Sequence, residues 1–242
     1  MTLTLFQKGF NYSQDGPGNR LVYHLKGCNM RCPWCSNPEG IFGDRGHSET
    51  VSTEAIVTEV LSCRPMFFDG GGVTFTGGEA TLQFGALKEI LGILRTQGIH
   101  TAIETNATSP RLPELFPYLN CLIADLKHPD NTIHQAVTGV SNERIRQNIA
   151  LAADSGVDLL IRIPMIGGFN TDEETLQGFA DFFKPLASSN VRFEMLKYHE
   201  YGKDKWEKLG LPYAVTNARV EEGTRRHFED TFTQLDLTVV RT

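Results

Sequence analysis

The sequence predicts an α/β fold, a partial (β/α)6 TIM-like barrel of parallel strands with outer helices. Three observations lead to this prediction. Six short apolar segments alternate with segments of helical spacing, polar residues stand at the ends of the apolar segments, and no repeat or Pro/Gly/Ser linker divides the chain. Strands that alternate with helices pair in parallel through right-handed crossovers. An open doubly wound sheet is the competing architecture, and periodicity alone does not exclude it.

The six apolar segments are interpreted as strands because each is short, and most have glycine, proline or a charged residue at one or both ends. They are residues 21–26, 72–76, 100–105, 121–126, 158–163 and 191–196. Pro164 is expected to stop the fifth strand, because proline lacks a backbone N–H. Residues 237–241 are a candidate terminal strand.

Helices are expected between these strands. Residues 53–62 are expected to form a helix with Thr53 as a candidate N-cap. Residues 171–183 are expected to form another, with Thr171 and Glu174 in capping-box spacing. In residues 82–96, five side chains are expected to share one helix face: Leu82, Leu87, Ile90, Leu91 and Leu94. The other predicted helices are residues 110–119, residues 133–155 with a break near Gly139, and residues 221–235.

Polar residues follow or end each of the six predicted strands. They are Cys28, Glu79, Glu104, Asp125 with Lys127, Arg162 and His199. Strands end at the surface, so some polar residues are expected there in any fold. All six strands show the pattern, with both signs of charge, and ligands bind at this rim of parallel α/β folds. The pattern favours the barrel and predicts a ligand site.

Composition restricts the class of protein. The formal net charge is −6, which argues against broad, charge-driven binding of nucleic acid. No apolar run approaches the roughly 18 residues of a membrane helix, and residues 1–11 lack the order of a signal peptide. We therefore expect a cytoplasmic protein, a single domain over residues 1–242 and a monomer, without nucleic-acid or membrane partners.

Three of the five cysteines form a C-x3-C-x2-C cluster of Cys28, Cys32 and Cys35. Thiolates are soft ligands that suit zinc, copper(I) or iron–sulfur clusters. A structural zinc ion normally takes four ligands, and no fourth Cys or His stands in register here. A cubane cluster held by three cysteines would leave one iron open to a small molecule. A zinc-binding module and three unrelated buried thiols stay as alternatives, while Cys63 and Cys121 are expected to be buried packing residues.

Together with a Gly-Gly-Glu after the next strand, this cluster resembles the radical S-adenosylmethionine (SAM) enzymes. Asp15-Gly16-Pro17-Gly18-Asn19-Arg20 resembles the DGPG-x-R segment of activating enzymes for glycyl-radical enzymes, the pyruvate formate-lyase-activating type in particular. Residues 71–80, 99–106, 125–127, 138–142 and 198–206 resemble the same family. One cysteine lies between Cys35 and Gly72, so the cysteine-rich ferredoxin-like insertion of some activating enzymes is not expected.

The resemblance implies an oxidoreductase that reductively cleaves SAM at a [4Fe–4S] cluster. The 5′-deoxyadenosyl radical would take a hydrogen atom from a glycine of a partner glycyl-radical enzyme, pyruvate formate-lyase or a relative. Flavodoxin or ferredoxin would be the electron donor. The alternative is a radical SAM enzyme that acts on a small molecule.

The resemblance also implies the site residues. Cys28, Cys32 and Cys35 are the expected metal ligands, and Asp15 and Lys127 are the expected catalytic residues. Glu104, Thr105 and Asp125 resemble a monovalent-cation site. Glu104 and Ser36 depart from the activator, which has Asp and His at these positions. The expected cofactor-binding residues are Trp34, Ser36, Gly77, Gly78, Glu79, Glu104, Thr105, Asp125, Lys127, Arg162 and His199.

Overall fold

The computed structural model describes residues 1–42 and 46–242. The strands are β1 (Thr2–Tyr12), β2 (Asn19–Leu25), β3 (Glu49–Ser52), β4 (Gly72–Gly77), β5 (His100–Thr105), β6 (Cys121–Asp125), β7 (Asp158–Met165) and β8 (Val191–Lys197). Their order in the sheet is β3-β1-β2-β4-β5-β6-β7-β8. All six predicted strands are present, and their order in the sheet follows their order in the chain, as in the barrel that the sequence predicts.

The described helices are α1 (Pro38–Ile41), α2 (Thr53–Ser62), α3 (Phe84–Thr96), α4 (Asn131–Thr138), α5 (Glu143–Ser155), α6 (Glu173–Phe183), α7 (Lys203–Lys208) and α8 (Glu222–Gln234). Short 3-10 turns are η1 (Arg64–Met66), η2 (Ala80–Gln83), η3 (Leu112–Tyr118) and η4 (Lys184–Leu186). Within the described part of the chain, no helix is long and apolar enough to cross a bilayer.

The chain divides into two compact units. The first consists of residues 1–29, 37–105 and 109–123, and the second of residues 30–36, 106–108 and 124–242. In the first unit β2 pairs in parallel with β4, and β4 with β5. In the second unit β7 pairs in parallel with β8. The prediction of parallel strands is thus confirmed for these pairs.

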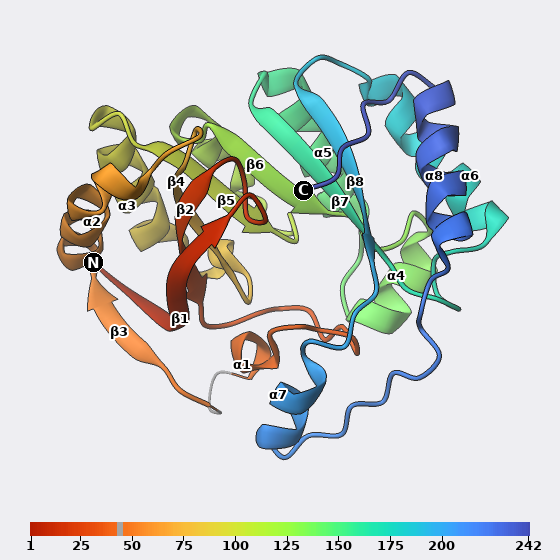
Figure 1. Cartoon of the computed structure of the whole chain (residues 1–242), viewed down its shortest axis with the longest axis horizontal. Helices are drawn as coiled ribbons and strands as arrows, with labels where there is room; N and C mark the ends of the chain where they lie inside the picture. The colour runs from red at the N-terminus through yellow and green to blue at the C-terminus, as the bar shows by residue number, and fades with distance from the viewer. Residues whose placement is uncertain (43–45) are drawn as a thin grey trace. The chain divides into compact units, whose positions relative to one another are not determined.

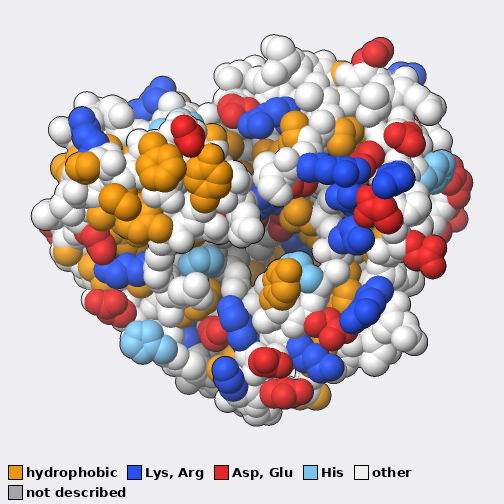
Figure 2. Space-filling model, in the orientation of Figure 1, with side chains coloured by type: hydrophobic (Ala, Val, Ile, Leu, Met, Phe, Trp, Pro, Cys, Tyr) orange, Lys and Arg blue, Asp and Glu red, His pale blue; other side chains and the backbone are white. Residues whose placement is uncertain are grey.

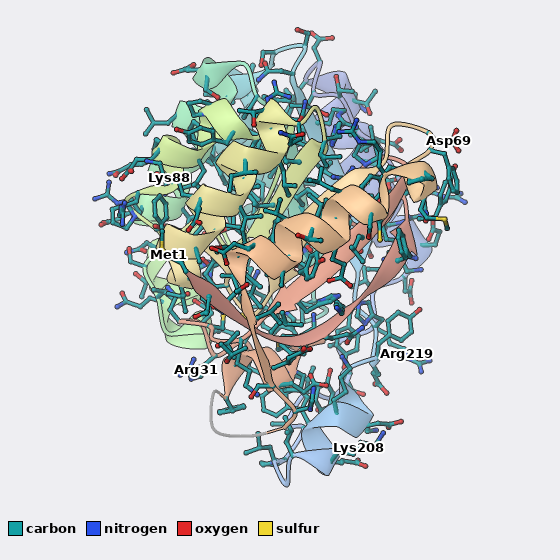
Figure 3. All side chains as sticks on the ribbon, turned by 90° about the vertical axis from the view of Figure 1, so that its left-hand side faces the viewer. Met1, Arg31, Asp69, Lys88, Lys208 and Arg219 are labelled. Atoms are coloured by element: carbon teal, nitrogen blue, oxygen red, sulfur yellow. The ribbon has the colours of Figure 1, made fainter. Side chains whose placement is uncertain are left out.

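The core of the first unit lies between its strands and two helices. Helices α2 and α3 run side by side across the strands β1 and β2 (Figures 1 and 3). Leu87, Ile90 and Leu94 of α3 are completely buried, and full burial of such a side chain contributes about 1.5–3 kcal/mol. On the strands, the rings of Tyr23 and Phe75 stack at 5.4 Å.

The core of the second unit is rich in aromatic side chains. Phe183 of α6 contacts Phe193 of β8, with ring centroids 4.9 Å apart, and Phe232 of α8 lies 5.3 Å from Phe193. Edge-to-face contacts of this kind add to the free energy of burial. They attach α6 and α8 to the strand pair β7–β8.

Two strands, β1 and β3, were not predicted from the sequence. β1 pairs antiparallel with β2 over residues 5–12, and β3 pairs antiparallel with β1. The outer half of β1 is mostly exposed, and β3 has no buried residue. Neither segment therefore shows the apolar run by which the other strands were predicted, because backbone pairing places them rather than side-chain burial.

Several predicted boundaries are wrong for local reasons. Ser52, not Thr53, caps α2 and accepts from the N–H of Ala55 at 3.1 Å, and Asp172, not Thr171, caps α6. Such assignments shift easily by one residue.

Three other expectations about the elements are also wrong. β7 continues through Pro164 to Met165, because the proline stands next to the last residue of the strand, where a missing N–H costs little pairing. Leu82 lies in a 3-10 turn before α3 and is 52% exposed, so it does not share the buried face. Residues 237–241 form one isolated bridge, Phe193 to Val239, rather than a strand.

Candidate functional site

The loop after β2 carries the three clustered cysteines. Cys32 is buried, and Cys28 and Cys35 are half-buried. All five cysteines lie in the described part of the chain, and no two of them form a disulfide. Among residues 1–42 and 46–242, no three His, Cys, Asp or Glu side chains are already arranged as metal ligands. The donor set of three thiols on one loop nevertheless fits an iron–sulfur cluster.

The second half of this loop is anchored within the second unit. The N–H of Arg31 donates to the carbonyl of Thr138 at 2.8 Å, and the indole N–H of Trp206 donates to the carbonyl of Cys35 at 2.9 Å. A Cβ at Gly202 would lie 2.4 Å from the same carbonyl oxygen. The ends of α4 and α7 therefore determine the backbone path around Cys32 and Cys35.

The Gly-Gly-Glu segment packs directly against the first half of the loop. The N–H of Gly78 donates to the carbonyl of Leu25, and the N–H of Glu79 donates to the carbonyl of Gly27 at 2.7 Å. A Cβ at Gly78 would lie 2.1 Å from the oxygen of Gly27, and Gly77 has φ +113°. Only glycine fits the close approach at position 78 and the positive φ at position 77. These two residues therefore bring the end of β4 against the residue before Cys28.

Glu79 is completely buried within the first unit. Its Oε1 accepts from the N–H of Thr81 at 2.9 Å, from the Thr81 hydroxyl at 2.5 Å and from the Thr105 hydroxyl at 2.6 Å. These three donors hold the carboxylate in one orientation. Glu104, the neighbour of Thr105 on β5, accepts instead from the Thr76 hydroxyl at 2.8 Å. The structure thus brings Glu79 and Thr105 together, two residues whose link the sequence did not reveal.

Asp125 and Lys127 form an ion pair at the end of β6. The Nζ of Lys127 lies 2.7 Å from Oδ2 of Asp125, and the Lys127 side chain is 9% exposed. The Nδ2 of Asn170 donates to the backbone carbonyl of Lys127 at 2.8 Å. This ion pair holds a positive and a negative group side by side. A zwitterionic ligand can form charge-assisted hydrogen bonds with such a pair.

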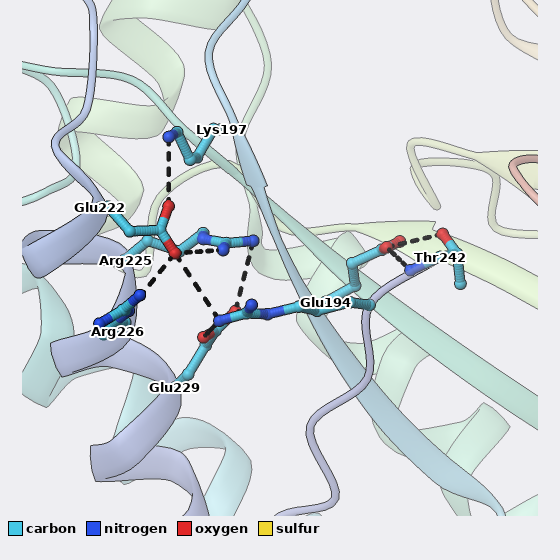
Figure 4. A network of polar contacts seen from close by, with 8 residues as sticks. Glu194, Lys197, Glu222, Arg225, Arg226, Glu229 and Thr242 are labelled. Atoms are coloured by element: carbon cyan, nitrogen blue, oxygen red, sulfur yellow. Dashed lines mark hydrogen bonds and ion pairs between the residues drawn. The ribbon is translucent and has the colours of Figure 1, made fainter.

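Arg162 of β7 lies beside a buried carboxylate of β8. Its Nε donates to Oε2 of Glu194 at 2.9 Å, and both side chains are almost completely buried. The second carboxylate oxygen, Oε1, accepts from the N–H of Thr242 at 2.7 Å and from its hydroxyl at 2.6 Å (Figure 4). Glu194 thus orients the predicted ligand-binding guanidinium, and the C-terminal residue orients Glu194.

Trp34 and Ser36 lie on the cysteine loop and are half-buried. The Trp34 ring lies 4.8 Å from the ring of Phe169, which in turn lies 5.2 Å from His128. His128 is 2% exposed, and burial lowers the pKa of its imidazole. Trp34 is therefore part of a cluster of tilted aromatic rings in the second unit.

His199 follows β8 and stacks on Tyr201, with ring centroids 4.2 Å apart. It lines a pocket of about 300 Å3 together with Lys197, Tyr198, Glu200, Arg219 and Val220. The pocket is open to a ligand and carries groups of both charges.

Asp15 lies on the β1–β2 hairpin, and its Oδ2 accepts from the Nδ2 of Asn11 at 2.5 Å. The hairpin also contains Arg20, the arginine of the DGPG-x-R segment, for which the sequence predicted no role. Arg20 is completely buried; its Nε donates to the Thr74 hydroxyl at 2.7 Å and its Nη1 to the carbonyl of Pro17 at 3.0 Å. The Thr74 hydroxyl donates in turn to the carbonyl of Asp15 at 2.7 Å. Burial lowers the Arg20 pKa to about 10, so the guanidinium stays charged at neutral pH.

Comparisons with known proteins show the family of this chain. The profile of the radical SAM superfamily matches residues 22–180. The pyruvate formate-lyase-activating enzyme of Staphylococcus epidermidis is 34% identical over 213 residues, covering 84% of each chain. The pyruvate formate-lyase 1-activating enzyme of Escherichia coli is 32% identical over 210 residues, covering 85% of this chain and 84% of that enzyme.

Solved structures give the same answer. A domain of pyruvate-formate lyase-activating enzyme from Bacteroides vulgatus has a TM-score of 0.58 and 32% identity, and covers 71% of this chain and 98% of its own. SuiB of Streptococcus suis, bound to the precursor peptide SuiA, has a TM-score of 0.66 at 17% identity, covering 91% of this chain and 48% of that one. This second likeness concerns the fold.

The family uses a [4Fe–4S] cluster and SAM, which fits the three thiols of the loop after β2. The relatives do not favour the alternative of a small-molecule substrate. The chain therefore belongs to the radical SAM superfamily and, within it, to the family of pyruvate formate-lyase-activating enzymes.

Proposed function

We propose that this chain is an activase that installs a glycyl radical on a partner glycyl-radical enzyme, with pyruvate formate-lyase as the first candidate. The observation that carries the proposal is the cysteine loop after β2, against which the Gly-Gly-Glu backbone is hydrogen-bonded at Glu79 N–H to Gly27 O, 2.7 Å. This arrangement occurs in a chain that matches curated activating enzymes over most of its length.

Cys28, Cys32 and Cys35 would hold the cluster. When bound, the cluster would supply the electron for reductive cleavage of SAM, and the resulting radical chemistry would remove the hydrogen atom of the partner's glycine. The protein's own task is to orient the reactants and to keep the radical from solvent.

Five of the other predicted site residues would bind SAM. Gly77 and Gly78 place backbone without a Cβ beside the cysteine loop, where the methionine amino group would approach, and buried Glu79 supplies a fixed negative charge. Lys127 and Arg162 would bind carboxylate or ribose oxygens. Each already has a carboxylate partner, Asp125 or Glu194, which holds it in place.

Four further roles complete the proposal. Trp34 and His199 would contact the adenosine part, Trp34 from its tilted contact with Phe169 and His199 from its pocket. Ser36, beside Cys35, would adjoin the same ligand. Glu104, Thr105 and Asp125 stay the candidate residues for a monovalent cation, with the Thr105 hydroxyl donating to Glu79. Asp15, on the hairpin loop that Arg20 holds, would approach the partner's glycine segment.

We further propose that residues 1–242 act as one domain, as a monomer in the cytoplasm, with flavodoxin or ferredoxin as donor. A reducing compartment keeps cluster ligands as thiols, which supports this location. Size-exclusion chromatography of the reconstituted protein tests the monomer, and reduced flavodoxin and ferredoxin are compared as donors in SAM cleavage.

Anaerobic reconstitution tests the function. The protein should bind about four irons and form 5′-deoxyadenosine from SAM under reduction. With a panel of purified glycyl-radical enzymes, electron paramagnetic resonance should show a glycyl radical on the cognate partner. SAM cleavage without a radical on any partner would refute the activase and leave a radical SAM enzyme of another substrate. A colourless protein with one zinc would refute the cluster as well.

A further inference from the structure

The β1–β2 hairpin carries an exposed aromatic surface. Phe10 and Tyr12 of β1 are 45% and 52% exposed. Met66 and Phe68, in the connection between α2 and β4, are 49% and 50% exposed. We call these residues, with Phe67, the hairpin patch. Four of the ten exposed large hydrophobic side chains in the described residues therefore lie in one place. Figure 2 shows hydrophobic side chains gathered on this part of the first unit.

The hairpin patch is an ordered surface rather than a set of loose side chains. The rings of Phe10 and Phe67 lie 6.4 Å apart, and those of Tyr12 and Phe68 lie 6.1 Å apart. The Tyr12 hydroxyl donates to Oδ2 of Asp69 at 3.0 Å, a residue that Figure 3 labels at the edge of the first unit. Large ordered apolar patches on a soluble protein usually mark a contact surface.

The patch is joined to the loop that carries Asp15. The N–H of Asn19 donates to the carbonyl of Phe68 at 3.1 Å, and the Nδ2 of Asn19 donates to the carbonyl of Met66 at 2.8 Å. Gly18 has φ +65°, and a Cβ there would lie 2.3 Å from the oxygen of Phe68. Residues 15–18 and residues 66–69 are thus one packed surface, in which the first part is the segment that would approach the partner's glycine.

We propose that the hairpin patch docks the folded body of the glycyl-radical enzyme, an apolar surface of that protein beside its glycine segment. This inference rests on the proposed function. Contact with the folded partner at the hairpin patch would extend the interface beyond the reacting loop. The patch is continuous with that loop, and aromatic side chains dominate the binding energy of protein interfaces.

The test separates docking from chemistry by comparing two substrates. Phe10→Ser with Phe68→Ser removes two of the three phenylalanine rings of the patch, and Leu151→Ser on α5, where Leu151 is 50% exposed, is the control. Glycyl-radical formation is measured against the concentration of intact partner and against a short peptide that carries the radical glycine. We expect the KM for the intact partner to rise about tenfold or more in the double variant. The rate with the peptide, the iron content and uncoupled SAM cleavage should match those of the wild type.

A second measurement uses the wild-type protein and so does not depend on the folding of a variant. Amide hydrogen exchange with and without the intact partner should show protection of residues 9–12 and 66–69. An unchanged KM, an equal loss with the peptide, or no protection of these segments would overturn the proposal. It would also be overturned if the variant slowed SAM cleavage with reduced flavodoxin but not with dithionite, because the patch would then bind the electron donor.

The two proposals fail in different ways. If the wild type makes a glycyl radical and the double variant does so with the same KM, only the docking proposal is wrong. If the wild type makes no glycyl radical on any partner, the proposed function is wrong and the docking proposal with it.

Discussion

Replacement of Arg20 by methionine gives the sharpest test of how the hairpin loop is held. The wild-type guanidinium is completely buried and donates to the Thr74 hydroxyl, to the Pro17 carbonyl and, through Nη2, to the Val73 carbonyl at 2.7 Å. Methionine fills a similar volume but donates nothing. The buried Thr74 hydroxyl, the buried Val73 carbonyl and the part-buried Pro17 carbonyl then each lose a donor, at about 1 kcal/mol or more each.

The expected loss in free energy of unfolding is therefore about 3 kcal/mol, which corresponds to a fall in Tm of roughly 6–12 °C for a chain of this length. Loss of the Pro17 contact and weakening of the Thr74–Asp15 link should also release residues 15–18. Glycyl-radical formation should fall by about tenfold or more, while uncoupled SAM cleavage stays within about twofold of the wild type.

Urea unfolding, iron analysis and paired assays of SAM cleavage and glycyl-radical yield measure these effects. Thr74→Val is a graded comparison, because it removes the relay to Asp15 and keeps the guanidinium. A change in unfolding free energy below about 1 kcal/mol would refute the hydrogen-bond argument. A parallel loss of SAM cleavage and radical yield would refute the assignment of Arg20 to the partner loop.

Three further changes test other parts of the site. Gly78→Ala should lower iron incorporation severalfold, because its Cβ would lie 2.1 Å from the oxygen of Gly27. Glu194→Gln should destabilise the fold by about 3–5 kcal/mol and weaken SAM binding, because it leaves the Arg162 charge buried without its carboxylate. Burial lowers the pKa of His134 to about 4 from 6.5. The unfolded chain therefore takes up the proton first, and about 3 kcal/mol of stability is lost as the pH falls from 6.5 towards 4.

Iron analysis, urea unfolding and isothermal titration with SAM follow the first two changes, and urea unfolding from pH 7 to pH 4.5 follows the third. Gly92→Ala is the control for Gly78, because its Cβ would meet nothing closer than 3.8 Å. Normal iron content in Gly78→Ala would contradict the close approach. If Glu194→Gln had the same free energy of unfolding as the wild type, the fold would not depend on the Arg162–Glu194 ion pair. His134→Gln should make the free energy of unfolding less dependent on pH. If the dependence were identical to that of the wild type, groups other than His134 would cause it.

Much of the fold was predictable from local sequence. The strands β2 and β4–β8 were predictable as short apolar runs, since most of their residues are buried. The strands β1 and β3 did not, because antiparallel backbone pairing across the hairpin and the edge places them. The caps Ser52 and Asp172 differ from the predicted ones by one residue, since several polar residues in a row compete for the same N–H groups.

The site shows the same division. Residue types and spacing identified the three thiols, the glycines and the charged residues at strand ends, because ligand chemistry and backbone freedom depend on the residue itself. Tertiary structure alone revealed the partners: Thr105 for Glu79, Glu194 and Thr242 for Arg162, and Pro17 with Thr74 for Arg20.

The sequence by itself indicated the class of chemistry, since the spacing of three thiols with a following Gly-Gly-Glu segment resembles that of the radical SAM enzymes. Only the tertiary structure decided how those groups are held and what surrounds them. A buried ion pair such as Arg162–Glu194, or a surface such as that of Tyr12 and Asp69, arises between residues far apart in the chain. Such contacts depend on how segments pack, and no local pattern of residues encodes them.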